Sequence, residues 1–312
     1  MRYSSLSTNN HNGLRGDSIL EEIMARREIM SRLKSGDRLL LDGAMGTEIR
    51  KRSKKVNRQS ATVDDPELVR EIHDDYLLAG ADIITTNTFD SGRVSLERIG
   101  PPGANMEHYH RLATQIALEE RDKLQPSGYV AGGISIPRGP QRAGTPGSVE
   151  TYADYQAQSN VLADAGVDLL LYEFIGYADD CVAAATAGKE TGLPVFLGLR
   201  WVRGSEGTME SHETFEELVS KLSGLRVDGL LPMCCNPPAA TGALTKLSES
   251  FGGVLGAYPR VGDVTGDYTP KEFAYHAAHW LDAGAQIVGG CCFTRPAHIA
   301  ALDPLVHDTR AA

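Results

Sequence analysis

The chain has 312 residues, of which 41% are hydrophobic and 23% are charged, a composition typical of a soluble globular protein. Its formal net charge of −10 argues against a protein that binds along the backbone of nucleic acids, because such proteins carry basic faces. The polar N-terminus lacks an apolar secretory segment and no run of 18 apolar residues occurs, so we expect a cytoplasmic protein that spans no membrane.

The first part of the chain divides into a tail and a helix. Residues 1–16 are polar and contain several Ser, Asn and Gly residues, which predicts a disordered tail. The following segment, "SILEEIMARREIMSRLKSG", has Ile and Leu at helical spacing, a capping residue at Asp17 or Ser18 and a stop at Gly36. We expect a helix here, and one folded domain over residues 17–312.

Short runs rich in Leu or in β-branched residues recur along the rest of the chain, and each is bounded by glycine or proline. They are apolar nearly throughout rather than alternating, as strands buried on both faces should be. Helical patterns such as "PELVREIHDDYLLAG" lie between most of them. The predicted strands lie within residues 38–43, 81–89, 129–135, 167–174, 194–201, 227–234, 252–259 and 285–292.

A weak internal repeat supports one repeated unit. The segments "LLAGADII", "LADAGVDLL" and "LDAGAQIV" share a helix end, a glycine that can adopt the left-handed conformation, and the start of a strand. Strand–helix alternation predicts a parallel sheet, and no GxGxxG follows any strand, which removes support for a dinucleotide-binding fold. We therefore predict an α/β protein with a single (β/α)8 TIM barrel, in preference to an open doubly wound sheet. Active sites of such barrels lie on the loops that follow the strands.

Two pairs of adjacent cysteines stand at the ends of predicted strands, Cys234–Cys235 and Cys291–Cys292. Three thiolates, one from the end of the sixth predicted strand and two from the end of the eighth, favour zinc, and a site with three protein ligands keeps a fourth position for a substrate. A thiol bound there would be deprotonated at neutral pH. The alternative is that the cysteines pack as small apolar residues, which is the better account of Cys181.

Several motifs together carry a family resemblance over roughly Leu39 to Ile299: "LLLDGAMGTEI", "PELVREIHDDYLLAGADIITTNTF", "GVDLLLYEF", "CCNPP", "GAYPRVGD" and "GGCC". On these motifs the chain resembles the zinc-dependent homocysteine S-methyltransferases. That family includes the betaine–homocysteine and S-methylmethionine–homocysteine enzymes and the homocysteine module of cobalamin-dependent methionine synthase. Its fold is the barrel expected above.

The resemblance implies a set of zinc ligands. The last two cysteine ligands of the family correspond to Cys291 and Cys292 in this chain. The third ligand of the family is the cysteine of an Asn-Cys pair followed closely by proline. "CNPP" is the better match for that motif, so we expect Cys235 to be the third ligand, with Cys234 in reserve where the family has Asn.

The resemblance also implies how the amino acid is bound. The family's aspartate in "DGAMGT" and its glutamate after strand 4 hold the ammonium group, which points to Asp42 and Glu173. These assignments suit a zwitterion, because carboxylates attract its ammonium group and amides its carboxylate. The backbone N–H groups expected to hold that carboxylate belong to Gly43, Ala44 and Met45. The end of the second predicted strand adds Asn87, Thr88 and Phe89 as further candidate substrate contacts.

The sequence departs from the family at the predicted mouth. Phe174 stands where the betaine enzymes have a tyrosine that can reach the metal, and Arg260 stands where many members have asparagine. Three further arginines, Arg138, Arg200 and Arg203, follow the third and fifth predicted strands. If they face the ligand, they would favour an anionic group on the donor or the acceptor.

The expected activity is transfer of a methyl group to the thiol of homocysteine, which gives methionine, with Zn2+ as the cofactor. S-methylmethionine or, less well, S-adenosylmethionine is the favoured donor, and betaine or dimethylsulfoniopropionate is the alternative. A different thiol acceptor, a methyl group delivered by a partner protein, or a non-enzymatic zinc- or amino-acid-binding role also fits. The partners expected are thus a small thiol and a methyl donor, with no nucleic acid. The sequence leaves the oligomeric state open.

Overall fold

The structure is a computed structural model that describes residues 29–136, 147–201, 207–262 and 268–307. The helix expected over residues 17–36 is present as far as it is described, because residues 29–34 are helical. Its earlier part and the tail of residues 1–16 lie outside the described residues. No helix within the described ranges is long and apolar enough to cross a membrane.

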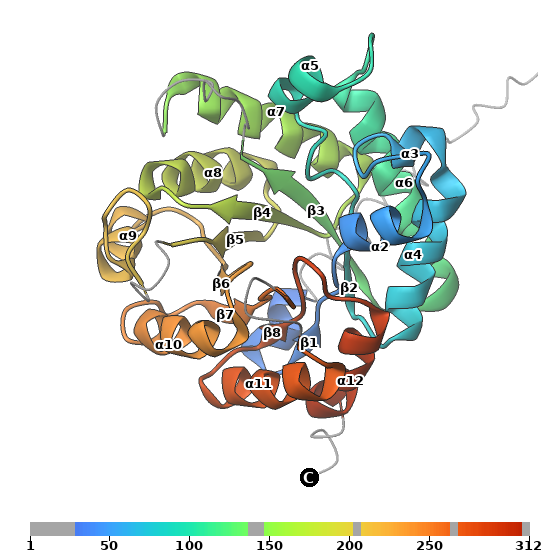
Figure 1. Ribbon diagram of the computed structural model, residues 1–312. Coiled ribbons are helices and arrows are strands. Elements are labelled where there is room, and N and C mark those ends of the chain that lie inside the picture. The colour runs from blue at the N-terminus through green and yellow to red at the C-terminus, as the bar shows by residue number, and fades with distance from the viewer. Residues whose placement is uncertain (1–28, 137–146, 202–206, 263–267, 308–312) are drawn as a thin grey trace, which may run out of the picture.

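The strands form one closed parallel barrel, which confirms the predicted fold (Figure 1). The neighbours run in the order β1-β8-β7-β6-β5-β4-β3-β2, and a parallel bridge between Leu41 and Ile83 joins β1 to β2. Seven of the eight strands lie inside runs predicted from the sequence, and β4 extends one residue beyond its predicted run, to Ile175. Their bounds are β1 Leu39–Leu40, β2 Ile83–Thr85, β3 Tyr129–Ser135, β4 Leu169–Ile175, β5 Val195–Leu199, β6 Gly229–Pro232, β7 Val254–Ala257 and β8 Ile287–Val288.

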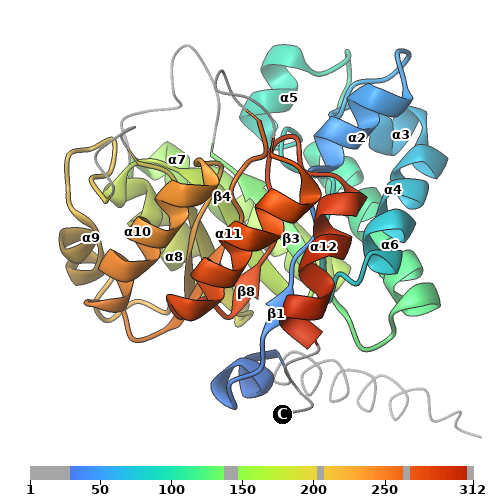
Figure 2. The same cartoon turned by 60° about the horizontal axis from the view of Figure 1, so that its bottom comes forward.

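The two ends of the barrel differ. At the end where the strands finish, α2 (Met45–Arg52), α3 (Ala61–Asp64) and α5 (Arg93–Ile99) stand above the sheet (Figure 2). At the opposite end, the helical residues 29–34 cover the bottom, and Ile29 and Leu33 are buried against the barrel interior. Among the described residues, this helix covers the end of the barrel opposite to the loops that carry the predicted site.

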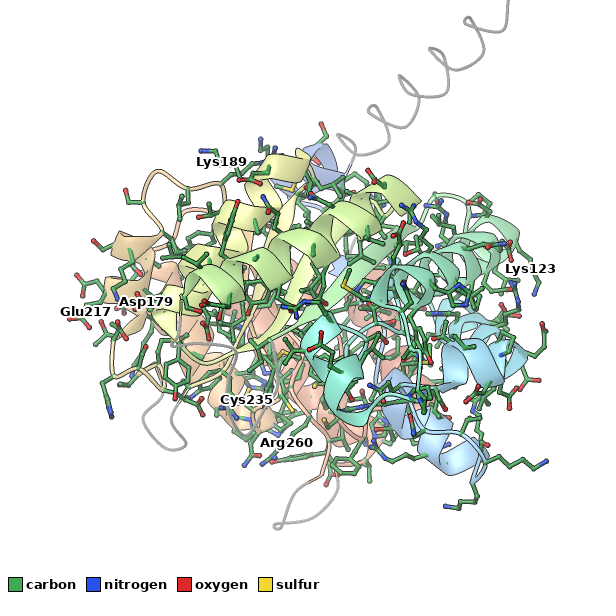
Figure 3. The ribbon with its side chains drawn as sticks, turned by 90° about the horizontal axis from the view of Figure 1, so that it is seen from above. Lys123, Asp179, Lys189, Glu217, Cys235 and Arg260 are labelled. Carbon is green, nitrogen blue, oxygen red and sulfur yellow. The ribbon has the colours of Figure 1, made fainter. Side chains whose placement is uncertain are left out.

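The remaining helices surround the sheet, and exposed charged side chains such as Lys123, Lys189 and Glu217 point outward from them (Figure 3). Gly80, Gly166 and Gly284 all have positive φ, between 95° and 98°, immediately after helices, which confirms the glycine stops read from the internal repeat. The bounds of these helices are α4 Pro66–Leu78, α6 Met106–Leu124, α7 Val149–Ala165, α8 Ala178–Thr191, α9 Phe215–Lys221, α10 Pro237–Ser248, α11 Pro270–Asp282 and α12 Pro296–His307.

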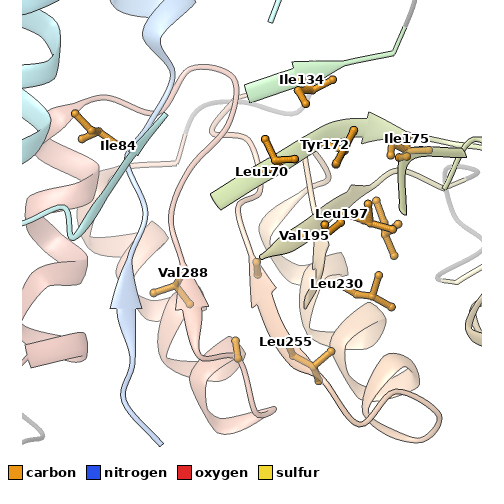
Figure 4. Packing of buried hydrophobic residues seen from close by; sticks show 14 of the residues in the cluster. Ile84, Ile134, Leu170, Tyr172, Ile175, Val195, Leu197, Leu230, Leu255 and Val288 are labelled. Carbon is orange, nitrogen blue, oxygen red and sulfur yellow. The ribbon is translucent and has the colours of Figure 1, made fainter. Parts of the chain in front are cut away.

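Each strand buries both of its faces, which explains the continuous apolar runs in the sequence. Leu170, Leu197 and Leu230 belong to the layer between sheet and helices (Figure 4). Leu171 and Leu231, one residue further along their strands, belong instead to the cluster that fills the barrel. This alternation decides which side chains at the strand ends point toward the axis.

Candidate active site at the mouth of the barrel

A cavity of about 260 Å³ opens at the end of the barrel where the strands finish. Its walls come from the ends of β2 and β4 and from the segments that follow β1, β2, β6, β7 and β8, so residues far apart in the sequence meet there. Most of the predicted site residues contribute to its wall, as expected for loops at the C-terminal face of such a barrel. They are Asp42, Gly43, Ala44, Met45, Asn87, Phe89, Glu173, Cys234, Cys291 and Cys292.

Three thiols cluster in the wall of this cavity. The Sγ atoms of Cys234, Cys291 and Cys292 all lie within 4.8 Å of one another. Sγ of Cys292 is 3.6 Å from that of Cys234 and 3.9 Å from that of Cys291. Two sulfurs bound tetrahedrally to one zinc ion at about 2.3 Å lie about 3.8 Å apart. The cluster therefore has the spacing of a three-thiolate zinc site.

The third member of the cluster is Cys234, whereas the sequence motif favoured Cys235. Leu231 and Met233 point into the barrel, and regular alternation would send Cys235 the same way. Cys234 instead adopts a left-handed backbone with φ 51°, which breaks the alternation at the end of β6. As a result Cys234 packs against the barrel interior and Cys235 against the outer layer. Cys235 lies beside Arg260, whose N–H donates to its carbonyl (Figure 3).

The two glycines before the terminal cysteines allow β8 to approach its neighbours closely, as the sequence suggested. A Cβ atom on Gly289 would lie 2.6 Å from the carbonyl oxygen of Leu41. A Cβ atom on Gly290 would collide with the side chain of Thr294. Neither contact is tolerable, so side chains at these positions would push Cys291 and Cys292 away from the cavity.

The three thiols differ in pKa. Hydrogen bonds from Cys234 and Cys291 lower the pKa of Cys292, and the charges of Arg58 and Arg50 lower it further. The same interactions with Cys234 and Cys292, together with burial, raise the pKa of Cys291 well above its usual value. The protein by itself thus favours the thiolate form of Cys292, and a bound dication would favour the thiolate form of all three cysteines.

Asp42 is a buried carboxylate at the base of the cavity. Its two oxygens accept hydrogen bonds from the backbone N–H of Thr85 at 2.7 Å and from the Thr85 hydroxyl at 3.1 Å. Burial nevertheless raises its pKa to about 7, against the effect of both hydrogen bonds. The carboxylate therefore has a strong electrostatic preference for a cationic group.

Glu173 brings a second carboxylate to the cavity from β4. A Cβ atom on Gly133 of β3 would lie 3.0 Å from Oε1 of Glu173, so the glycine makes room for this carboxylate. Asp42 and Glu173, which are far apart in the sequence, thus line the same cavity.

The segment after β1 turns into α2 along the wall of the cavity. The N–H of Ala44 donates to Oγ1 of Thr294 at 3.1 Å, so this amide has a protein partner. Gly43 and Met45 line the cavity on either side of it. Met45 is the first residue of α2, and the first amides of a helix have no intrahelical acceptor, which suits a carboxylate.

The segment after β2 has mixed roles. The side-chain amide of Asn87 donates to the carbonyl of Arg58 at 2.9 Å and to Oγ1 of Thr62 at 3.0 Å, so it fixes the loop before α3. Thr88 is fully buried, its hydroxyl donates to the carbonyl of Gly133 at 2.6 Å, and it does not line the cavity. Phe89 lines the cavity with its ring. Of the three predicted contacts, Asn87 and Phe89 line the cavity and Thr88 does not.

Sequence reasoning missed two cations in the wall, Arg50 and Arg58. They lie in and after α2 rather than at a strand end, and only a basic run, "RKRSKK", marks their neighbourhood. The arginines that sequence reasoning did single out are placed differently. Arg200 stacks 4.3 Å from the ring centroid of Phe174 and pairs with Glu210, and neither Arg200 nor Arg260 lines the cavity. Arg138 and Arg203 lie outside the described residues.

Residues beside the cavity adopt costly backbone conformations. Phe174, Cys234 and Phe293 have φ of 66°, 51° and 68°, in the left-handed region that bulky side chains avoid. Phe174 lies near the end of β4, and Cys234 and Phe293 follow β6 and β8. Such strain is typical of functional sites, where the surrounding fold holds a conformation that the local sequence does not favour.

A sequence model of one family, described as homocysteine S-methyltransferase, matches residues 39–306. The chain is 26% identical to homocysteine S-methyltransferase 1 of Brassica oleracea var. italica over 309 residues, which cover 86% of this chain and 93% of that protein. It is 25% identical to homocysteine S-methyltransferase 1 of Zea mays, with coverage of 92% and 98%.

Solved structures agree with this relationship. The homocysteine methyltransferase MmuM from Escherichia coli, in its metallated form, superposes with a TM-score of 0.74 at 27% identity, over 88% of this chain and 98% of that one. The carboxyl transferase domain of Rhizobium etli pyruvate carboxylase, in its Y628A form, superposes with a TM-score of 0.54 at 13% identity, and shares the fold alone.

Proposed function

Because this chain belongs to the homocysteine S-methyltransferase family, we propose that its thiol cluster holds zinc and that its cavity brings homocysteine against a small sulfonium methyl donor. Methyl transfer to homocysteine is the activity that this membership carries. The metal, the donor and the roles of individual residues are our assignments.

The sulfur geometry is the observation that carries the metal assignment. Cys234, Cys291 and Cys292 present three sulfurs at the spacing that zinc requires, and all three line the cavity. Zinc held there would supply the positive charge that keeps a substrate thiol deprotonated at neutral pH. The five cysteines are free thiols, which fits a reducing compartment, and we keep the cytoplasm as the expected location.

The other residues of the cavity suit the amino-acid part of homocysteine. Asp42 and Glu173 would pair with its ammonium group, since both carboxylates line the wall. The backbone N–H groups of Gly43 and Met45, just before and at the start of α2, would donate hydrogen bonds to its carboxylate. Held at both ends, the molecule would direct its thiol toward the cysteine sulfurs, and this fixed orientation would contribute to the rate.

The transfer itself needs no further cofactor. The acceptor sulfur, which has lost its proton to solvent, forms a bond to the methyl carbon, while the bond from that carbon to the donor sulfur breaks. The electron pair of the broken bond stays on the donor sulfur, so the sulfonium becomes a neutral thioether and the acceptor becomes methionine. A cavity of about 260 Å³ lies just below the usual range for small-molecule sites, about 300–1,000 Å³, which favours S-methylmethionine over a donor that carries adenosine.

The experiment is methionine formation by the reduced, zinc-loaded protein with homocysteine. S-methylmethionine, S-adenosylmethionine, betaine and dimethylsulfoniopropionate are supplied in separate reactions. We expect methionine with S-methylmethionine and none after Cys291→Ser. Zinc-loaded protein that makes no methionine from any donor would contradict the proposal.

A further inference from the structure

Two guanidinium groups lie together at one edge of the cavity. Arg50 of α2 and Arg58 of the loop before α3 both line the cavity that contains the thiols. A Cβ atom added to Gly46 would lie 2.9 Å from Cδ of Arg58 and 3.7 Å from Nη1 of Arg50. The two side chains therefore converge over Gly46, in the first turn of α2. We call this pair the arginine edge.

Arg58 is fixed in place before any ligand arrives. Its carbonyl accepts a hydrogen bond from the Asn87 side chain at 2.9 Å, its guanidinium pairs with Asp90, and its Cζ lies 5.2 Å from the ring centroid of Phe89. Each partner restricts a different part of the residue. A group held in this way loses little conformational entropy on binding a ligand.

Asp90 partly neutralises the positive charge of Arg58, whereas the charge of Arg50 is not neutralised in this way. Within the described ranges, no carboxylate oxygen lies within the ion-pair distance of its guanidinium, and its side-chain hydrogen bond, to the hydroxyl of Thr47, is long at 3.4 Å. The side chain is exposed at the rim. A planar guanidinium can bind a carboxylate with two parallel hydrogen bonds, so Arg50 is available for an anionic group that enters the cavity.

The charges around the cavity define two different environments. The arginine edge carries positive charge, which attracts an anion, and it lies in the wall of the same cavity as the sulfurs of the thiol cluster. On the basis of the proposed function, we propose that Arg50, supported by Arg58, binds a carboxylate of the methyl donor. The donor is then a small zwitterion whose sulfonium faces the sulfurs and whose carboxylate faces the arginine edge. Arg50 is a specificity-determining residue in this assignment.

The test compares two donors that differ only in this charge: dimethylsulfoniopropionate and its primary amide. For the native protein we expect kcat/KM to be roughly ten- to hundredfold higher with the carboxylate, the range for a hydrogen bond to a charged group. Arg50→Gln should bring the ratio of the two kcat/KM values close to one. A variant that loses activity equally with both donors would overturn the assignment. So would one that raises the KM of homocysteine instead, because Arg50 would then bind the acceptor.

Lys51→Gln is the matched control. Lys51 is the next residue of the same helix, is exposed, and does not line the cavity. Its substitution removes the same charge from α2, so a general electrostatic effect would appear in both variants. The native ratio of the two donors should persist in Lys51→Gln, and an equal loss in both variants would overturn the assignment.

A binding measurement separates this inference from the proposed function. 4-Methylpentanoate has the shape of dimethylsulfoniopropionate with carbon in place of the sulfonium sulfur, so it cannot donate a methyl group. Calorimetry on the zinc-loaded protein should show that the acid binds more tightly than its amide, and that Arg50→Gln removes the difference. If this holds while no donor is turned over, only the proposed function fails. Equal binding of acid and amide to the native protein would overturn the inference, whatever the activity.

Discussion

The sulfur of Cys234 lies 3.6 Å from the sulfur of Cys292, although the two residues are 58 positions apart in the sequence. The contact joins the ends of β6 and β8, strands that are separated by β7 in the sheet. Neighbouring strand ends of a closed barrel converge on its axis, so side chains that turn inward there must meet. This contact and the inward turn of Cys234 lead to the first prediction.

Cys234→Ser should abolish zinc binding, whereas Cys235→Ala should retain it. The reason is that Cys234 belongs to the sulfur cluster and Cys235 packs against the outer layer. Metal content of the purified proteins should fall from about one equivalent to near zero in the first variant only. Circular dichroism controls for misfolding. Zinc retained by Cys234→Ser and lost from Cys235→Ala would show that the assignment of the third ligand is reversed.

Binding of the amino-acid ligand should become tighter as the pH rises through 7. Burial raises the pKa of Asp42 to about 7, and an ammonium group is attracted only to the ionised carboxylate. Norleucine has no thiol, so its binding reports this site without thiol ionisation. Its Kd should fall about tenfold between pH 6 and pH 8, because the ionised fraction of such a carboxyl rises by about that factor.

Two variants separate Asp42 from its neighbour in this measurement. Asp42→Asn should bind norleucine weakly, with little change between pH 6 and pH 8. Glu173→Gln should also bind weakly but should keep the slope, since Asp42 is still present. A slope that survives in Asp42→Asn would assign the pH dependence to another group.

The buried imidazole of His73 should make the fold sensitive to acid. In the described part of the chain neither of its ring nitrogens has a hydrogen-bond partner, and burial lowers its pKa to about 4. The ordinary value is 6.5. Between those values the unfolded chain binds the proton that the folded protein excludes, so stability is lost as the pH falls below about 6.5. The free energy of unfolding should fall by up to about 1.4 kcal/mol per pH unit through this residue.

Urea denaturation between pH 7 and pH 4 measures this loss. His73→Phe should reduce the slope of stability against pH, and His108→Gln, at an exposed position, should leave it unchanged. His110 is also buried with a pKa lowered to about 4, so part of the slope should remain in His73→Phe. A slope identical to that of the native protein would contradict the role assigned to His73.

Gly198→Ala should destabilise the protein by about 1–3 kcal/mol, the usual cost of overpacking a core. A Cβ atom at this position of β5 would collide with the hydroxyl of Tyr258 and would lie 2.9 Å from Sδ of Met233. Tyr258→Phe removes the colliding oxygen. The double variant should therefore lose less stability than the sum of the two single changes. Gly252→Ala, whose Cβ would meet nothing within 4 Å, should be close to neutral, and strict additivity would contradict the predicted contact.

The strands and the barrel could be predicted from the sequence because their signal is local. Runs such as "VDLLLYEF" are apolar throughout, and glycines such as Gly166 end the preceding helices. Eight such units leave few ways to bury every strand on both faces. The same pattern indicated that Asp42, Glu173 and the cysteine pairs stand at strand ends, and hence at one mouth.

Two features depended on the tertiary structure alone. The sequence places both Cys234 and Cys235 at the end of β6, but only the left-handed backbone at Cys234 decides which sulfur faces Cys292. Likewise, the basic segment that contains Arg50 and Arg58 gives no sign of a site in the sequence. The two residues line the cavity because α2 folds over the mouth of the barrel. Composition and periodicity report the average burial of a strand or helix. The direction of one side chain at its end depends on a single dihedral angle, which contacts with distant strands determine.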